Sequence, residues 1–180
     1  MSSGIKWGLI TGMVLIVQSL LSNVLGVGQD PNVSPIMGLL VTVVGVVATF
    51  ATIYMGIKEA RDTELNGQMN IGLGIRKGLK IALIGGIILG IYSIIYVKFI
   101  DPDMMNRIMA AQEAQFEEKN MTEDQINMAL KMMSVFKNPF LVAAMSILMT
   151  CFWGLFQSMI AGAILKKDAP PTVPPTAPVI

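Results

Sequence analysis

The chain contains no histidine, and among its 180 residues it has a single cysteine, Cys151. Without histidine the chain lacks the side chain that most often serves as a general base or metal ligand near neutral pH. One cysteine can form neither a disulfide framework nor a cysteine metal cluster within one chain. We therefore expect no enzymatic activity, no cofactor and no metal centre.

Charge is scarce as well. Charged residues make up 14% of the chain and hydrophobic residues 53%, whereas an ordinary soluble domain carries about 25% charged residues. The mean hydropathy is +0.64. The net charge of +1 gives no reason to expect a nucleic acid partner.

The few charges leave four windows without Asp, Glu, Lys or Arg, at residues 7–29, 31–57, 81–97 and 138–165. A helix needs roughly 20 apolar residues to cross the hydrocarbon core of a bilayer. The third window is the shortest. It reaches this length if Lys98 extends its ammonium group toward the headgroups, because Phe99 and Ile100 can then lengthen the apolar stretch. The sequence therefore predicts an all-α, polytopic membrane protein with the lipid bilayer as a partner and four transmembrane helices, near residues 7–27, 36–57, 79–100 and 140–165.

The first span has a second interpretation, a cleaved signal peptide with Lys6 as its positive residue. Its apolar stretch is longer than the hydrophobic region of a signal peptide, which has about 7–15 residues. It also contains Gln18, Ser22 and Asn23 without a clear small-x-small cleavage site. We expect this segment to be retained as a span.

Lysine and arginine predict the orientation. Four spans place both termini on one side of the membrane, with eight basic residues: Lys6, Lys58, Arg61, Arg76, Lys77, Lys80, Lys166 and Lys167. The long loop on the other side, from Lys98 to Lys137, has five basic residues, which are outnumbered by seven carboxylates. We predict a multi-pass protein of the cytoplasmic (inner) membrane with both termini in the cytoplasm.

The connection over residues 101–138 carries two helix signals. Asp101-Pro102 predicts a helix start with Asp101 as the N-cap and Asp103 in the first turn. Thr122 and Gln125 have the spacing of a capping box, which predicts a second helix. Apolar residues follow each start at helical spacing. We predict an extracytoplasmic amphipathic helical hairpin that rests on the bilayer or packs on a partner.

Seven of the 15 methionines lie in this hairpin. Thioethers are soft ligands for Cu(I), and Met105/Met109 and Met128/Met132 are pairs one helical turn apart. Methionine is also a flexible apolar side chain common at adaptable interfaces. Without histidine or a nearby cysteine, we favour the interface over a copper site.

Small residues recur every four positions in two of the predicted spans. Such seams let helix backbones approach closely in a membrane, so we interpret them as packing seams rather than hinges or ligand contacts. The helix-packing seams are Gly78, Ala82, Gly86 and Gly90 in the third span, preceded by Gly74, and Ser146, Thr150, Gly154, Ser158 and Gly162 in the fourth. Gly4, Gly8 and Gly12 repeat the pattern near the first span.

Four segments together resemble a family of small bacterial membrane proteins known only as a domain of unknown function with four predicted spans. They are residues 54–62 (YMGIKEARD), 72–78, 99–103 (FIDPD) and 121–126 (MTEDQI). The resemblance covers nearly the whole chain apart from its C-terminal tail. It implies the four-span architecture, and it brings no established activity, ligand or catalytic residue.

The charged end of the second span is the candidate interaction cluster, and its other interpretation is a salt-bridged helix end. It consists of Lys58, Glu59, Arg61 and Asp62. We assign residues 1–167 to the transmembrane domain. Residues 168–180 contain five prolines and predict a disordered tail.

The expected function is that of a non-enzymatic structural or partner-binding membrane component. The partner would be a second copy of the chain or another membrane protein. The alternative is a subunit of a small-solute or ion transporter or channel. The polar residues inside the charge-free windows are neutral, whereas ionisable residues usually mark ion and proton paths. Gln18 and Gln157 are the residues that we expect to hydrogen-bond between helices.

Overall fold

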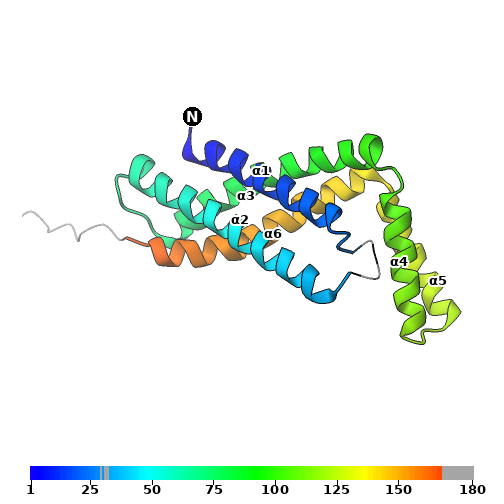
Figure 1. Ribbon diagram of the computed structural model, residues 1–180. Helices are drawn as coiled ribbons and strands as arrows, with labels where there is room; N and C mark the ends of the chain where they lie inside the picture. Colours follow the sequence, from blue (N-terminus) through cyan, green and yellow to red (C-terminus); the bar gives the residue numbers. More distant parts are fainter. Residues whose placement is uncertain (29, 31–32, 168–180) are drawn as a thin grey trace, which may run out of the picture.

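A computed structural model describes residues 1–28, 30 and 33–167, and within them the regular structure is helical (Figure 1). The predicted tail over residues 168–180 lies outside the described residues. The long helices α1 (Ser3–Val24), α2 (Pro35–Glu64), α3 (Ile71–Ile95) and α6 (Pro139–Leu165) form a bundle. The shorter helices α4 (Met104–Glu118) and α5 (Glu123–Ser134) form a hairpin across one end of it.

Each predicted span lies on one long helix, and all four helices are long and apolar enough to cross a membrane. The boundaries differ most at the charged end of the bundle, where α2 ends and α3 begins. There α2 continues past Ile57 to Glu64, and α3 begins at Ile71 rather than Leu79. The side chain of Asn70 caps α3 by accepting a hydrogen bond from the amide of Leu73 at 2.8 Å. Charged residues of the Lys, Arg and Glu type are good helix formers, so they mark the edge of the apolar stretch and not the end of the helix.

The connection between α2 and α3 turns at Asn66 and Gly67, whose φ angles of 52° and 78° are left-handed. Asparagine and glycine tolerate this conformation better than other residues. Beyond the turn, Met69 pairs with Lys167 through two backbone N–H···O hydrogen bonds of 2.9 Å. This bridge joins the α2–α3 connection to the end of α6.

Helix α3 packs closely against α1 on one side and α6 on the other. A Cβ atom added to Gly12 of α1 would lie 2.7 Å from Cδ1 of Ile88. A Cβ atom added to Gly86 would lie 3.2 Å from Cα of Ile147 in α6, and one on Gly90 would lie 3.2 Å from a backbone carbonyl oxygen of α6. The backbones therefore meet where side chains are absent, which is the favourable contact for helices in lipid.

Other residues of the predicted seams face one another at the same α3–α6 interface. The facing pairs are Gly74 with Gly162, Gly78 with Ser158, Ala82 with Gly154, and Gly86 with Thr150. Ser158 is fully buried, and its hydroxyl donates to the carbonyl of Gly154 within α6. The hydroxyl is thereby satisfied by its own helix, so that Gly78 of α3 can pack directly against the side chain of Ser158.

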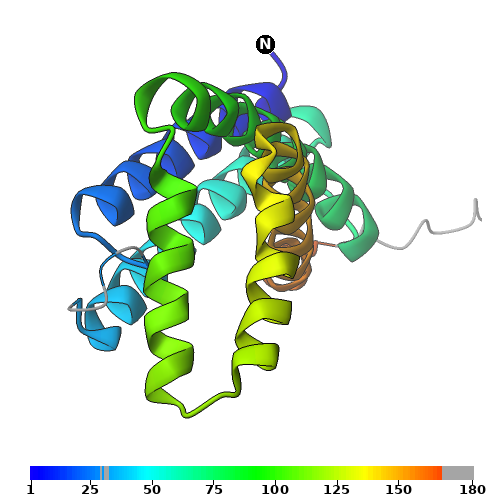
Figure 2. The same ribbon diagram turned by 90° about the vertical axis from the view of Figure 1, so that its right-hand side faces the viewer.

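The hairpin runs across the bundle axis, and its tip extends past the bundle (Figures 1 and 2). Helix α5 begins with the predicted capping box. The hydroxyl of Thr122 accepts from the amide of Gln125 at 3.4 Å, and the amide of Thr122 donates to Oε1 of Gln125 at 3.0 Å.

The predicted start of the first hairpin helix was wrong. Helix α4 begins at Met104, and Asp103 precedes it without a side-chain capping bond in the described part of the chain. The carboxylate of Asp101 interacts with the backbone amides of Asp103 and Met104 and binds the guanidinium of Arg107, whose Nη1 donates to Oδ1 at 3.0 Å and whose Nη2 donates to Oδ2. A two-pronged, charge-assisted pair is stronger than a single capping bond. The guanidinium holds the pKa of Asp101 below its usual range.

We expect Gly86→Leu to destabilise the bundle, because a side chain there would meet the backbone of α6. The expected loss in free energy of unfolding in detergent is about 1–3 kcal/mol, as for other overpacked sites. The matched control is Gly72→Leu, because a Cβ on Gly72 would lie 3.5 Å from Oδ1 of Asn70, which is an ordinary contact distance. Equal stability of the two variants would contradict close packing at Gly86.

We expect the Asp101–Arg107 ion pair to make the root of the hairpin sensitive to acid. Because the pKa of Asp101 is lowered in the folded state, the pair stabilises the fold fully above the unfolded value of about 3.9. This contribution is lost as the pH falls through the lowered value. The mobility of a spin label at Ala110→Cys, in a Cys151→Ala background, should rise as the pH falls through the lowered pKa of Asp101. Arg107→Gln should be mobile at every pH and Arg76→Gln should behave like the parent; a pH response retained in Arg107→Gln would contradict the assignment.

Candidate functional site

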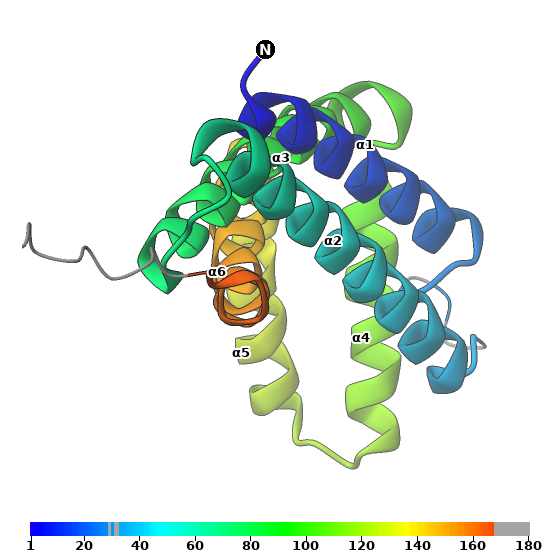
Figure 3. The ribbon, with the colours of Figure 1, turned by 90° about the vertical axis from the view of Figure 1, so that its left-hand side faces the viewer.

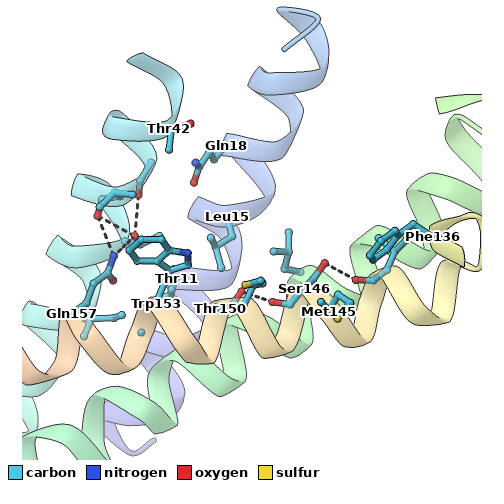
Figure 4. Close-up of a pocket in the computed structure, with 18 of the residues that line it drawn as sticks. Thr11, Leu15, Gln18, Thr42, Phe136, Met145, Ser146, Thr150, Trp153 and Gln157 are labelled. Atoms are coloured by element: carbon cyan, nitrogen blue, oxygen red, sulfur yellow. Dashed lines mark hydrogen bonds between the residues drawn. The ribbon is translucent and has the colours of Figure 1, made fainter. Parts of the chain in front are cut away.

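A groove of about 610 Å³ lies between α2 and α6, which cross and then diverge toward the hairpin (Figures 3 and 4). We call it the α2–α6 groove. Its walls come from α1, α2 and α6, with Leu89 from α3, and its lining is mostly apolar. Met105 and Phe136 from the hairpin segment also line it. The lining residues Val46 and Trp153 are 42% and 58% exposed, so the groove is open at its side.

Neutral polar groups link α6 to α2 in the wall of the groove. Nε2 of Gln157 lies 3.1 Å from the hydroxyl of Thr49 and 3.4 Å from the carbonyl oxygen of Val46, and it donates to both (Figure 4). The hydroxyl of Thr49 donates in turn to the carbonyl of Gly45 at 2.9 Å. Gln157 is 7% exposed. This is an interhelical hydrogen bond of the kind expected for Gln157.

A similar link joins α1 to α2. The hydroxyls of Thr11 and Thr52 are hydrogen-bonded at 2.9 Å, and Thr52 donates to the carbonyl of Thr49 at 2.8 Å. Nearer the hairpin, the side chain of Gln18 lies directly against Gly45, where a Cβ atom would have no room. Figure 4 shows Gln18 on the side of the groove where Thr42 lies. The groove therefore has neutral amide and hydroxyl groups on an otherwise apolar wall.

Three residues of the predicted seam in α6, Ser146, Thr150 and Gly154, also line the groove. The hydroxyl of Ser146 donates to the carbonyl of Val142 at 2.8 Å, and that of Thr150 to the carbonyl of Ser146 at 2.7 Å. Both hydroxyls are thus satisfied within the helix. Sequence reasoning assigned these residues to packing alone, because helical spacing does not show where two helices diverge.

The four residues of the candidate interaction cluster do not converge on one site. Glu59 accepts hydrogen bonds from Nζ of Lys6 and from Nε1 of Trp7 on α1, both at 2.8 Å. Lys58 is exposed. The other two residues, Arg61 and Asp62, pair with each other at 2.7 Å.

Further contacts tie this charged end to the neighbouring helices. Arg61 also donates to the carbonyl of Leu165 at the end of α6, at 3.4 Å. Glu64 accepts from the amide of Ser3 at 2.7 Å and from Nζ of Lys77 at 2.6 Å, which joins α1, α2 and α3. We did not predict the role of Glu64, because Ser3 lies far from it in the sequence and only the fold brings them together. The contacts of Glu59, Arg61 and Glu64 hold helix ends together.

Four long helices apolar enough to cross a membrane, with a helical hairpin at one end, define a small helical membrane protein. The chain belongs to a family described as "Protein of unknown function (DUF4199)", whose model matches residues 6–167. The match spans nearly all of the bundle together with the hairpin, and it confirms the family resemblance of the sequence. No curated protein and no solved structure matches the chain.

We expect the side chains of Gln157 and Thr49 to be energetically coupled. A double-mutant cycle of Gln157→Leu and Thr49→Val isolates their hydrogen bond from the other effects of each change. The expected coupling is about 0.6 kcal/mol, the average for interhelical hydrogen bonds in a membrane protein. Pairing Gln157→Leu with Thr42→Val, whose hydroxyl donates to Gly38 of its own helix, is the control and should give no coupling. Additive effects in the first cycle would contradict the hydrogen bond.

Proposed function

We propose that this protein is a non-enzymatic membrane component that holds an apolar chain, such as the acyl chain of a lipid, in the α2–α6 groove. The groove itself is the observation that carries the proposal. Its volume of about 610 Å³ falls in the range of roughly 300–1,000 Å³ that is usual for ligand sites. Its mostly apolar lining suits an occupant without charge.

The position of the groove supports a lipid chain as the occupant. Residues beside its opening on α6 are large, apolar and exposed, among them Phe152 and Phe156. In a membrane these side chains face the acyl chains of the bilayer, because apolar surface of a span is lipid-facing surface. A lipid chain can therefore enter sideways without crossing water.

The chemistry of the lining supports binding rather than catalysis. Among the described residues that line the groove, none carries a charge. The titratable groups from which an acid, base or nucleophile is usually drawn are missing from this lining. Gln157 and Thr49 are hydrogen-bonded to each other, and the hydroxyls of Thr42, Ser146 and Thr150 are satisfied within their own helices.

Transport of a small solute or ion is the second candidate function. The observation that favours it is the set of neutral polar groups on the groove wall, including Gln18 and Thr42. Amides and hydroxyls of this kind can line a solute path. In this case the groove would hold a polar solute or an ion, so an experiment can distinguish transport from the binding of an apolar lipid chain.

The orientation and the membrane belong to the same proposal. We place the charged end of the bundle, with the N-terminus, in the cytoplasm and the hairpin on the other side of the cytoplasmic membrane. The excess of Lys and Arg near the charged end supports this arrangement,. The other partner that we consider is a second copy of the chain or a different membrane protein.

The test is photolabelling of the reconstituted protein with a phosphatidylcholine that carries a diazirine on its acyl chain. We expect the label to concentrate on groove residues such as Met149 of α6. Val46→Trp should reduce labelling of Met149 severalfold, because the indole fills the groove. Val47→Trp is the matched control, since Val47 is the exposed neighbour on α2 that does not line the groove.

Two results would overturn the lipid proposal. Uniform labelling over the outer faces of all four spans, unchanged by Val46→Trp, would mean that the groove holds no acyl chain. If Met149 stays unlabelled by the lipid, and a photoreactive residue placed at position 149 crosslinks one copy of the protein to another, a second chain fills the groove. A solute flux into protein-containing liposomes that Val46→Trp abolishes and Val47→Trp preserves would support the transport alternative.

A further inference from the structure

We infer that the α4–α5 hairpin lies flat on the bilayer surface with one methionine-rich face among the lipids. This inference concerns the hairpin and is independent of what occupies the groove. It selects between the two partners, bilayer or protein, that the sequence leaves open for this segment. Three observations carry it: the short roots of the hairpin, the side on which its apolar residues lie, and the groups at its base.

Both roots of the hairpin are fixed at the membrane boundary. The third candidate span ends at Ile100 and the fourth begins at Pro139. Only residues 101–103 separate the third span from α4, and α5 passes through a short 3₁₀ turn (Val135–Lys137) to Asn138. The hairpin also runs across the bundle axis (Figures 1 and 2). A helical hairpin that starts at the membrane boundary and runs across the axis of the bundle lies along the membrane surface.

The exposed apolar residues of α5 form a stripe that starts at the bundle end of the hairpin. Phe136 lines the outer end of the groove, so this side chain points toward the spans. Met132 lies one turn before Phe136, which is in the 3₁₀ turn that follows α5, and Met128 lies one α-helical turn before Met132, so the three side chains form a stripe that winds gradually around the helix,. They are 70% and 68% exposed, and Val135 beside them is 56% exposed. The stripe therefore continues from the groove along the hairpin to where the hairpin extends beyond the bundle.

Helix α4 has a similar stripe, whose residues are half-buried. Met105 lines the groove and so points toward the spans. Met109 follows one turn later and Phe116 three turns later on the same face. The surface between α4 and α5 uses other residues, since Ala111 and Ile126 are the buried residues of the two helices. Both helices thus turn a methionine and phenylalanine stripe toward the membrane side.

The groups at the base suit the level of the lipid headgroups. Nζ of Lys98 lies 5.3 Å from the ring centre of Phe140, where the third and fourth spans end and begin. Lysines near span ends extend toward the headgroups, and aromatic rings favour the same level. The stripe is continuous with the lipid-facing surface of the spans, whose outer residues Phe99, Ile100 and Phe140 are exposed. The same lipids that cover these residues can cover Met128 and Met132, and flexible thioethers adapt to such a fluid surface.

The experiment compares Met132→Cys with Asn127→Cys, each spin-labelled in a Cys151→Ala background of the full chain. Both positions are exposed on α5, and they lie on different faces of the helix. The protein is reconstituted in vesicles of phosphatidylcholine and phosphatidylglycerol. Accessibility is measured to oxygen, which concentrates in lipid, and to a water-soluble nickel chelate. We expect the oxygen-to-nickel ratio to be severalfold higher at position 132 than at position 127.

Two results would overturn the inference. Equal, nickel-accessible labels at both positions would mean that the hairpin stands in water. A label at position 132 that is shielded from both reagents would mean that a second copy or another protein covers the stripe. Because both substituted side chains are exposed, neither change removes a packing contact of the fold. A third label at Met128→Cys should behave like the one at position 132, and a nickel-accessible label there would also contradict a lipid-covered face.

Discussion

The close contact of α3 with both of its neighbours is the interaction on which the rest of the structure depends. Lipid is as apolar as leucine, so apolar burial gives little drive for helices to associate within a bilayer. Association then rests on van der Waals contact between backbones, which glycine permits. Gly12 brings α1 against α3, and Gly86 and Gly90 bring α6 against its other side. These three helices form the part of the bundle that is packed by small residues.

Helix α2 also packs closely on α1 and α3 at Gly56, but it is joined to α6 by hydrogen bonds, and the groove is a consequence. Its contacts to α1 and α6 include the hydrogen bonds that Thr52 accepts from Thr11 and that Thr49 accepts from Gln157, and its charged end is tied to α1 through Glu59. Hydrogen bonds at a few points permit a helix to lean, whereas a glycine seam keeps two helix axes close along their length. Toward the hairpin α2 leaves α6, and the space between them becomes the α2–α6 groove. Thr11, Thr49 and Gln157 thus join α2 to its neighbours by hydrogen bonds and also line the proposed ligand site.

How much could be predicted from the sequence depended on the range of the interaction. The spans, the capping box of Thr122 and Gln125, and the turn at Asn66-Gly67 follow from neighbouring residues or from windows of charge. The seams have a regular spacing, which indicates a face but not its partner. The roles of Glu64 and Asp101 could not be read in this way, because each depends on which partner the fold brings near. Asp101 had the local signature of a helix cap, and its carboxylate binds the guanidinium of Arg107 in addition to the backbone amides of Asp103 and Met104. The groove depends on the angle between two helices, which no local pattern encodes.

The π-helical turn over Tyr96–Ile100, at the end of α3, sets the direction of everything that follows it. In this turn the amide of Asp101 donates to the carbonyl of Tyr96, five residues back, at 2.8 Å. A π turn holds one residue more than an α turn, and each residue of an α-helix advances the chain by about 100° around the axis, from 3.6 residues per turn. The extra residue therefore fixes the direction, around the axis of the third span, in which the hairpin leaves that span. A chain with one residue deleted here would keep its four spans and its hairpin, but the hairpin would leave the membrane in another direction.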